Sequence, residues 1–192
     1  MDAFNRDSFI KKELGTLIGK FGIKTIIETG TYLGQTTEEF SKIVDNVLTI
    51  EINESYYASS KSKLKKYPNV KCLLGSSPNK MSEILSASEL NKPVLFYLDA
   101  HWGNYNPLID ELKRISLHKM KCSVIAIHDF KVPNKDFGYD NFPNGEPYSF
   151  EIIKSEIENI YGKDGYEYKY NDVAEGACRG IIYIYPKKIR IY

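Results

Sequence analysis

The chain has 192 residues, of which 42% are hydrophobic and 27% charged, a size and composition that fit one ordinary globular domain. Its 26 basic and 25 acidic residues leave a formal net charge of +1, which excludes a global field that would draw the protein to nucleic acid or to an anionic membrane. The N-terminus lacks the long apolar run that a signal peptide or a membrane span requires.

Apolar residues recur at helical spacing near the start of the chain, and they predict an amphipathic helix over residues 7–20 within an N-terminal helical segment, 1–22. Asp7 or Ser8 is placed to cap its start, and Gly22 to end it. We expect this helix to cover an edge or face of a sheet; a substrate lid is the alternative.

From residue 24 onward short apolar runs alternate with longer mixed segments, as in strands joined by crossover helices in a parallel sheet. The predicted strands are 24–28, 46–51, 70–74, 94–99, 123–128, 166–170 and 180–185. The predicted helices between them are 36–44, 54–66, 78–86, 107–119 and 149–161. The last two strands would form an antiparallel edge. The sequence therefore predicts a single doubly wound α/β domain over 1–192, with a mostly parallel seven-stranded sheet and helices on both faces.

Residues 130–148 break this pattern, because prolines, glycines and aromatic residues follow one another there without periodicity. The segment is longer than most connections in a compact domain. We expect a substrate loop or lid, with a disordered insertion as the alternative.

The three cysteines, Cys72, Cys122 and Cys178, are odd in number and lack the spacing of a metal site. Two of them fall within apolar, strand-like runs. We therefore expect buried thiols in a reducing compartment, and a cytoplasmic protein.

The end of the first predicted strand carries the most informative pattern, in which Glu28 is followed by Gly30, Gly34 and the start of a helix. The glycines allow a tight turn and close backbone approach, and the free N–H groups of the helix face a ligand above the strand end. A carboxylate at the strand tip repels phosphate but pairs with an ammonium group. The expected ligand is therefore a nucleoside that carries an amino acid, rather than a dinucleotide.

Two further strand ends extend this predicted cofactor site. Glu51 ends the second strand, 23 residues after Glu28, where one carboxylate can bridge the two hydroxyls of a ribose. A solvated strand terminus is the alternative for Glu51. Ser76 follows the third strand, where it either contacts the cofactor or caps the helix that begins near Pro78.

The fourth and fifth predicted strands end in acidic residues, Asp99 and Asp129. Adjacent parallel strands lie about 5 Å apart, so these carboxylates can share a divalent cation or orient a substrate hydroxyl. His101 is the first candidate for the base that takes the acceptor proton, and His128 the second. Local hydrogen bonding is the alternative role for each histidine.

This ordered set of motifs resembles the class I S-adenosylmethionine-dependent methyltransferases, over about residues 24–185. Glu28 to Gly34 looks like the acidic, glycine-rich first motif of that family, with Tyr32 in place of the usual middle glycine. The resemblance implies a Rossmann-like fold in which Gly30 and neighbouring backbone groups hold the methionine portion of S-adenosylmethionine. It implies that Glu28 organises the ammonium group directly or through water. It also implies that the following residues line the same pocket: Thr31, Tyr32 and Gln35.

The family commonly contacts adenine where Ser76 stands, and Asp99 lies at a strand tip that faces the cofactor. Asp99 and Asp129 further resemble the acidic ligands of metal-dependent O-methyltransferases of the catechol and antibiotic-sugar types. This resemblance implies a Mg²⁺ site formed by Asp99, Asp129 and His128, where His128 stands in place of the further Asp or Asn usual in those families. The catalytic residues that we expect are His101, Asp99 and His128.

Several aromatic residues lie near the expected mouth of the site, where they either stack on an acceptor or pack the loop onto the domain. They are Trp102, Tyr105, Phe137, Tyr139, Phe142 and Tyr148. Arg179, between the last two strands, either contacts an acidic substrate group or caps a carboxylate.

Rival chemistries lack their motifs. No Asn/Asp-Pro-Pro-aromatic sequence of a base methyltransferase follows the fourth strand, and no Gly-Lys-Ser/Thr phosphate loop follows the first. We expect O-methylation of a sugar or other small hydroxylated metabolite. The alternatives are an NAD(P)-dependent oxidoreductase and a non-catalytic S-adenosylmethionine-binding module. We expect a small-molecule or glycan substrate, no nucleic-acid or membrane partner, and allow for a homodimer.

Overall fold

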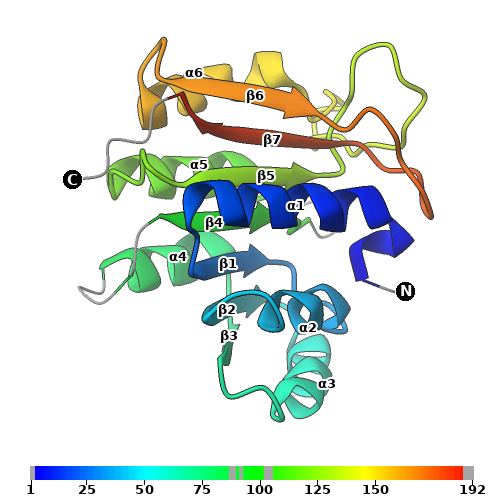
Figure 1. Ribbon diagram of the computed structural model, residues 1–192, viewed down its shortest axis with the longest axis vertical. Helices are drawn as coiled ribbons and strands as arrows, with labels where there is room; N and C mark the ends of the chain where they lie inside the picture. Colours follow the sequence, from blue (N-terminus) through cyan, green and yellow to red (C-terminus); the bar gives the residue numbers. More distant parts are fainter. Residues whose placement is uncertain (1–2, 87–89, 91–92, 102–105, 188–192) are drawn as a thin grey trace.

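A seven-stranded sheet forms the middle layer of the protein, as seen in the computed structural model, which describes residues 3–86, 90, 93–101 and 106–187 (Figure 1). Its strands are β1 (Thr25–Thr29), β2 (Asn46–Glu51), β3 (Val70–Leu74), β4 (Val94–Leu98), β5 (Val124–His128), β6 (Tyr166–Tyr170) and β7 (Ile181–Pro186). The spatial order is β3-β2-β1-β4-β5-β7-β6. Strands β1 to β5 pair in parallel, and β7 runs antiparallel to both β5 and β6. The predicted antiparallel edge is confirmed, with β7 as the reversed strand and β6 parallel to β5.

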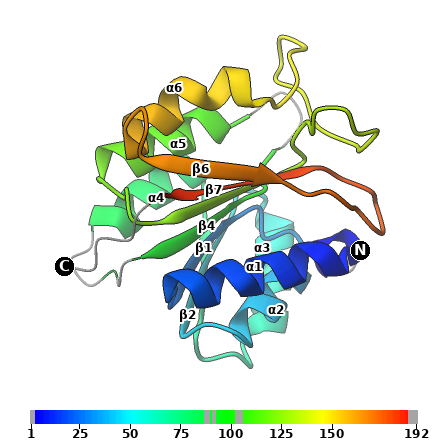
Figure 2. The same ribbon diagram turned by 45° about the horizontal axis from the view of Figure 1, so that its top comes forward.

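Helices cover both faces of this sheet, as predicted (Figures 1 and 2). They are α1 (Ser8–Phe21), α2 (Gln35–Ser41), α3 (Glu54–Leu64), α4 (Ser77–Ser86), α5 (Leu108–Leu117) and α6 (Phe150–Tyr161), with a short turn, η1 (Ala3–Arg6), before α1. Buried side chains of α1 and α2 share one core with one face of the sheet, and those of α4, α5 and α6 share a second core with the other face. The alternation of neighbouring strand residues between these cores explains why the central strands are apolar on both faces.

The N-terminal helix begins and ends where the sequence predicted. The Asp7 carboxylate accepts hydrogen bonds from the backbone N–H groups of Phe9 and Ile10, at 2.9 and 3.1 Å. Gly22 has a left-handed backbone with φ of 61° and ends the helix. The helix packs on a face of the sheet through apolar residues one turn apart, including Leu14 and Leu17.

The sheet creates a place for a ligand where its winding reverses. The chain goes outward from β1 through β2 to β3, and then returns to place β4 on the other side of β1. In open α/β sheets the crevice above the carboxyl ends of such strands is the usual binding site. Glu28, Asp99 and Asp129 all lie at this end of the sheet.

The loop 130–148 is pinned to the domain by backbone hydrogen bonds. Lys131 N–H donates to the Tyr148 carbonyl at 2.8 Å, and Asp140 N–H donates to the Asp129 carbonyl at 2.9 Å. Phe130 and Tyr148 are buried at its two ends. These contacts favour an ordered loop over the disordered insertion.

The expectation of buried thiols is wrong. Cys122 and Cys178 are exposed and Cys72 is half-buried, all three without a disulfide. Cys122 lies in the turn just before β5, and Cys178 lies in the connection between β6 and β7, so apolar neighbours in sequence do not place them in the core. No helix in the described part of the chain has the length and apolar character needed to cross a membrane.

Candidate functional site

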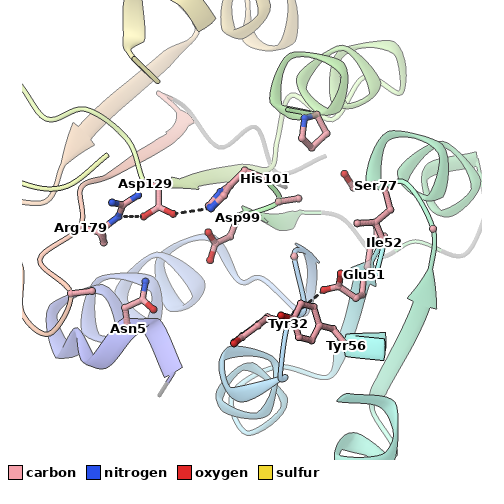
Figure 3. A pocket seen from close by; sticks show the side chains of 16 residues that line it. Asn5, Tyr32, Glu51, Ile52, Tyr56, Ser77, Asp99, His101, Asp129 and Arg179 are labelled. Atoms are coloured by element: carbon pink, nitrogen blue, oxygen red, sulfur yellow. Dashed lines mark hydrogen bonds and ion pairs between the residues drawn. The ribbon is translucent and has the colours of Figure 1, made fainter. Parts of the chain in front are cut away.

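A cavity of about 550 Å³ opens above the carboxyl ends of β1, β2 and β4, within the size range of small-molecule sites. Its lining includes Asn5, Gly30, Tyr32, Glu51, Ile52, Tyr56, Gly75, Ser77, Asp99, His101, Asp129 and Arg179. Figure 3 shows that the aromatic and acidic residues after β1 and β2 lie on one side, and His101 with its charged neighbours on the other.

The glycine turn after β1 brings two strands into contact. Gly30 has φ of +85°, and a Cβ atom at this position would lie 2.3 Å from the carbonyl oxygen of Asp99 at the end of β4. Its N–H group donates to the Ile50 carbonyl in β2 at 3.0 Å. Gly34, with φ of +72°, abuts the Leu64 side chain of α3 and does not line the cavity. Only Gly30 of the two glycines therefore has direct access to a ligand.

The carboxylate of Glu51 is held by backbone donors and faces the cavity. One oxygen accepts from Tyr32 N–H at 2.8 Å, and the other accepts from Asn53 N–H at 2.8 Å. The side chain is 7% exposed and lines the cavity. Each carboxylate oxygen retains a free lone pair, so two ligand hydroxyls can bind it as well.

The carboxyl group of Glu28 lies below the cavity rather than in its wall. It is fully buried and accepts hydrogen bonds from the hydroxyls of Thr37 and Thr49, at 2.5 and 2.7 Å. Burial raises its pKa to about 8, against these two hydrogen bonds, which lower it. Glu28 therefore does not touch the main cavity, and its predicted contact with an ammonium group needs an intermediary such as water.

Thr31 and Gln35 line a separate hollow of about 50 Å³ beside the main cavity, together with Gly30, Tyr32 and Asp99. Thr31 is also linked to the Glu28 group, because its hydroxyl lies 2.6 Å from that of Thr49. Gly30 and Tyr32, in the turn after β1, thus line both the main cavity and the smaller hollow.

The connection after β3 presents Gly75 and Ser77 to the cavity, whereas the predicted contact Ser76 does not line it. Helix α4 begins at Ser77, so the prediction missed the lining serine by one position. The Ser77 hydroxyl donates to the carboxyl group of Glu111, which is buried on α5. Burial raises the pKa of Glu111 to about 7.

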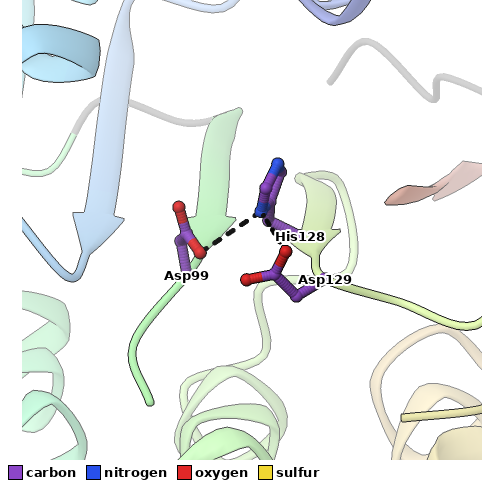
Figure 4. A group of neighbouring side chains, drawn as sticks. All are labelled: Asp99, His128 and Asp129. Atoms are coloured by element: carbon purple, nitrogen blue, oxygen red, sulfur yellow. Dashed lines mark ion pairs between the residues drawn. The ribbon is translucent and has the colours of Figure 1, made fainter. Parts of the chain in front are cut away.

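Asp99, His128 and Asp129 gather at the ends of β4 and β5, as predicted (Figure 4). The Nδ1 atom of His128 lies 3.4 Å from Asp99 and 3.0 Å from Asp129. Burial alone would lower the pKa of His128, but the two carboxylates raise it well above its usual value. His128 is 2% exposed and does not line the cavity, so this placement supports a charge between the carboxylates rather than a base that touches an acceptor.

The two carboxyl groups beside His128 differ in their titration. Burial raises the pKa of Asp99. Burial has the same tendency at Asp129, but the charges of His128 and Arg179 hold the pKa of Asp129 well below its usual range. Asp129 is therefore firmly ionised.

His101 is the predicted base that faces the cavity. Its side chain is 38% exposed, and its Nε2 atom lies 3.0 Å from Asp140 and 3.7 Å from Asp129. Asp140 comes from the loop 130–148, of which no residue lines the cavity. The loop acts on the site through this carboxylate.

Arg179, just before β7, contacts the same two carboxylates. Its Nε donates to Asp129 and its Nη2 donates to Asp140. Of the two roles predicted for Arg179, the structure shows the contact with a carboxylate of the protein.

A divalent cation fits this cluster poorly. Mg²⁺ prefers six oxygen ligands in octahedral geometry, and two groups of three described residues come close enough to share an ion: Asp99 with His128 and Asp129, and His101 with Asp129 and Asp140. Asp129 belongs to both groups, yet one of its oxygens already contacts both His128 and Arg179.

Sequence reasoning missed several residues of the site. Asn5 and Tyr56 line the cavity, and Tyr56 packs edge-on against Tyr32, with ring centroids 4.6 Å apart. The available signal for Tyr56 was its position in the first turn of the helix that follows the strand ending at Glu51. No sequence signal pointed to Asn5, because it is held at the site by a residue far along the chain: the Asn5 carbonyl accepts a hydrogen bond from Ala177 N–H.

The predicted aromatic surface mostly packs the loop. Phe142 lies against buried Tyr148, with ring centroids 4.7 Å apart, and the Lys131 ammonium lies over the exposed Tyr139 ring. Trp102 and Tyr105 lie outside the described residues.

Comparison with known proteins identifies the fold. No protein-family model and no curated protein matches the sequence. Among solved structures, an O-methyltransferase from Bacillus cereus in complex with S-adenosylhomocysteine matches with a TM-score of 0.68 at 17% identity, over 94% of this chain and 81% of that one. The O-methyltransferase TomG from Streptomyces achromogenes, involved in tomaymycin synthesis and bound to S-adenosylmethionine, matches with a TM-score of 0.66 at 15% identity, over 92% and 79%.

The 23S rRNA methyltransferase ErmE also matches, with a TM-score of 0.53 at 12% identity, over 92% of this chain and 68% of that one. At such identities the similarity establishes the fold alone, a Rossmann-like fold that this chain shares with these methyltransferase structures. Because ErmE and TomG share it, the fold alone does not select the acceptor.

Proposed function

We propose that the protein is an S-adenosylmethionine-dependent methyltransferase that O-methylates a small hydroxylated metabolite. The observation that carries this proposal is the Glu51 carboxylate, fixed by two backbone N–H groups and facing a cavity beside the glycine turn. A nucleoside ribose offers the two adjacent hydroxyls that such a carboxylate accepts. The reversed strand β7 supports this choice over a nicotinamide-dependent oxidoreductase, since dinucleotide-binding sheets follow the order 3-2-1-4-5-6.

The cavity offers a place for each part of the methyl donor. The ribose would lie at Glu51, and the adenine between Ile52, Tyr56 and Ser77. The methionine portion would lie over Gly30 and toward Asp99, where the backbone approaches without a side chain. Glu28 would support the ammonium group from below, through water.

When bound, the sulfonium donor supplies an activated methyl group, so the protein mainly has to align an acceptor oxygen and remove its proton. His101 would take that proton on Nδ1, because its Nε2 atom faces Asp129 and Asp140 and in the neutral imidazole carries the hydrogen directed at these carboxylates. These two carboxylates stabilise the positive charge that the imidazole then carries. Asp99 would orient the acceptor hydroxyl from the end of β4.

The acceptor that we favour is a sugar or another small hydroxylated metabolite, a glycan end included. A cavity of about 550 Å³ has room for a nucleoside and a small second molecule. The cytoplasmic location stays a prediction that cell fractionation would test. The homodimer stays a prediction that light scattering of the purified protein would test.

Calorimetric titration with S-adenosylhomocysteine tests the donor site without the acceptor. We expect micromolar affinity, about −8 kcal/mol, and no heat with NAD⁺ or NADP⁺ under the same conditions. Absence of binding, together with an unchanged melting temperature, would contradict the proposal. Binding without transfer to any member of a hydroxylated-acceptor screen, followed with methyl-labelled donor, would favour the non-catalytic module.

A further inference from the structure

Arg179 bridges two carboxylates that come from distant parts of the chain. Asp129 follows β5, Asp140 lies in the loop 130–148, and Arg179 precedes β7. A guanidinium that donates from two nitrogens to two carboxylates holds them at a fixed separation, which a single-point ammonium does not. With Asp99 beside them, these residues form what we call the carboxylate cluster: Asp99, Asp129 and Asp140. Figure 3 shows the guanidinium reaching Asp129 at the wall of the cavity.

The chain leaves room for this arginine at Gly138. A Cβ atom there would lie 2.9 Å from both Cδ and Nη1 of Arg179. The backbone at Gly138 is held in place on both sides, because its N–H donates to the Cys178 carbonyl at 2.8 Å and its carbonyl accepts from Gly180 N–H at 2.9 Å. A methyl group at position 138 would therefore require the guanidinium to shift from its present place.

The backbone on both sides of the ion pair has an uncommon conformation. Asp129 has φ of +55° and Cys178, next to Arg179, has φ of +53°. Positive φ in residues other than glycine is unfavourable and persists where surrounding contacts determine it. Here those contacts include the backbone hydrogen bond from Phe130 to Gly180, at 2.9 Å. Both partners of the ion pair are thus aimed at each other by the fold.

The negative charge of the cluster is already balanced in part. Arg179 carries a positive charge and donates to both Asp129 and Asp140. A divalent ion bound by Asp129 or Asp140 would lie beside the guanidinium that both carboxylates already contact, and the like charges would repel each other.

We propose that the Arg179 guanidinium takes the place of a divalent cation in the carboxylate cluster, so that the protein needs no metal ion. This departs from the Mg²⁺ site that the sequence predicts. This inference rests on the proposed function: Arg179 supplies a fixed positive charge beside the acceptor oxygen, where negative charge develops as the hydroxyl loses its proton. Its position in the lining of the cavity allows this without an added ion.

Binding of Mn²⁺, followed by electron paramagnetic resonance of the free ion, tests the proposal directly. We expect wild-type protein to leave millimolar Mn²⁺ free, and R179Q to bind it at least tenfold more tightly. The variant G138A should also gain binding, because its methyl group pushes the guanidinium away while the charge is kept. The control G15A adds a methyl group on the exposed face of α1, where nothing lies within 4 Å, and should bind no Mn²⁺.

The double variant R179Q/D129N locates the new site, since removal of a cluster carboxylate should abolish the gained binding. Circular dichroism confirms that each variant is folded; G138A changes no charge and keeps the test decisive if R179Q does not fold. Tight Mn²⁺ binding by wild-type protein would overturn the proposal, as would folded R179Q and G138A that bind none. Titration of the same samples with S-adenosylhomocysteine separates this outcome from a failure of the methyltransferase proposal.

Discussion

The two sides of the cavity are built by different means. On the side of β1 and β2, Glu51 is held by N–H groups of Tyr32 and Asn53. Glu51 is the last residue of β2, and the two donors lie in the connections that follow β1 and β2. On the side of β4, β5 and β7, the charged groups are held by one another, through the Arg179 contacts with Asp129 and Asp140. A site fixed by local backbone is readable from a short stretch of sequence, whereas one fixed by distant side chains is not.

The largest effect that we expect is on the side of the cavity formed by β4, β5 and β7, where His101→Gln removes the proposed base. Loss of a general base typically costs about 10²- to 10⁴-fold in rate, so turnover with an accepted substrate should fall by that order. Affinity for S-adenosylhomocysteine should stay within about twofold, since His101 lies across the cavity from Glu51. Stopped assays across pH, combined with calorimetry, measure both.

The control is His118→Gln, at the C-terminal cap of α5 and outside the cavity lining. Equal turnover of His101→Gln and the control would remove His101 from the mechanism.

The next largest effect is on the side of the cavity formed by β1 and β2, where backbone N–H groups hold Glu51. Glu51→Ala removes two charge-assisted hydrogen bonds to the ribose, each about 1.5–3 kcal/mol. Affinity for S-adenosylhomocysteine should therefore fall by about 100-fold or more, measured by calorimetry. Glu83→Gln, at an exposed carboxylate on α4, should bind like the wild type. Retained affinity in Glu51→Ala would show that the carboxylate does not hold the cofactor.

Gly30→Ala tests the contact between the two halves. A methyl group 2.3 Å from the Asp99 carbonyl, at φ of +85°, forces β1 and β4 apart, and we expect a loss of about 2–4 kcal/mol in the free energy of unfolding. Urea denaturation measures it, with Gly15→Ala in the open face of α1 as the matched substitution. If both alanine variants unfold at the same urea concentration as the wild type, the close approach is not as tight as described.

Per pH unit, the smallest effect is the change of stability with pH that comes from Glu28, below the side of the cavity formed by β1 and β2. Burial raises the pKa of Glu28 from 4.5 to about 8, so between these values the folded protein holds a proton that the unfolded chain has released. Stability from this group is therefore present at low pH and is lost as pH rises through this window, by about 1.4 kcal/mol per pH unit. Glu28→Gln should reduce that slope in urea titrations between pH 5 and 8.

Glu111, whose pKa is raised to about 7, adds a slope of the same sign in both proteins and cancels in the comparison. Parallel stability profiles for wild type and Glu28→Gln would mean that Glu28 is ionised in the folded state.

The sequence predicted every strand end to within one residue, because the central strands are apolar runs that both cores require. It also predicted the placement of Glu51 and Asp99, since a strand end carries its next residues to the edge of the sheet. It missed the Arg179–Asp140 contact, which depends on the room left at Gly138 and on positive φ at Cys178. No local pattern encodes these. The error at Cys122 has a different origin: the residue lies in the turn just before β5, where apolar neighbours in sequence do not imply burial.

The contact between Gly30 and the Asp99 carbonyl also bears on protein engineering. The turn after β1 fits closely against the peptide group at the end of β4, because the Asp99 carbonyl occupies the space that a side chain at Gly30 would need. A transplant of residues 28–34 into another scaffold would therefore carry only half of a fitted pair. Recombination between proteins of this fold should succeed when the crossover points keep the turn and the end of β4 from the same parent.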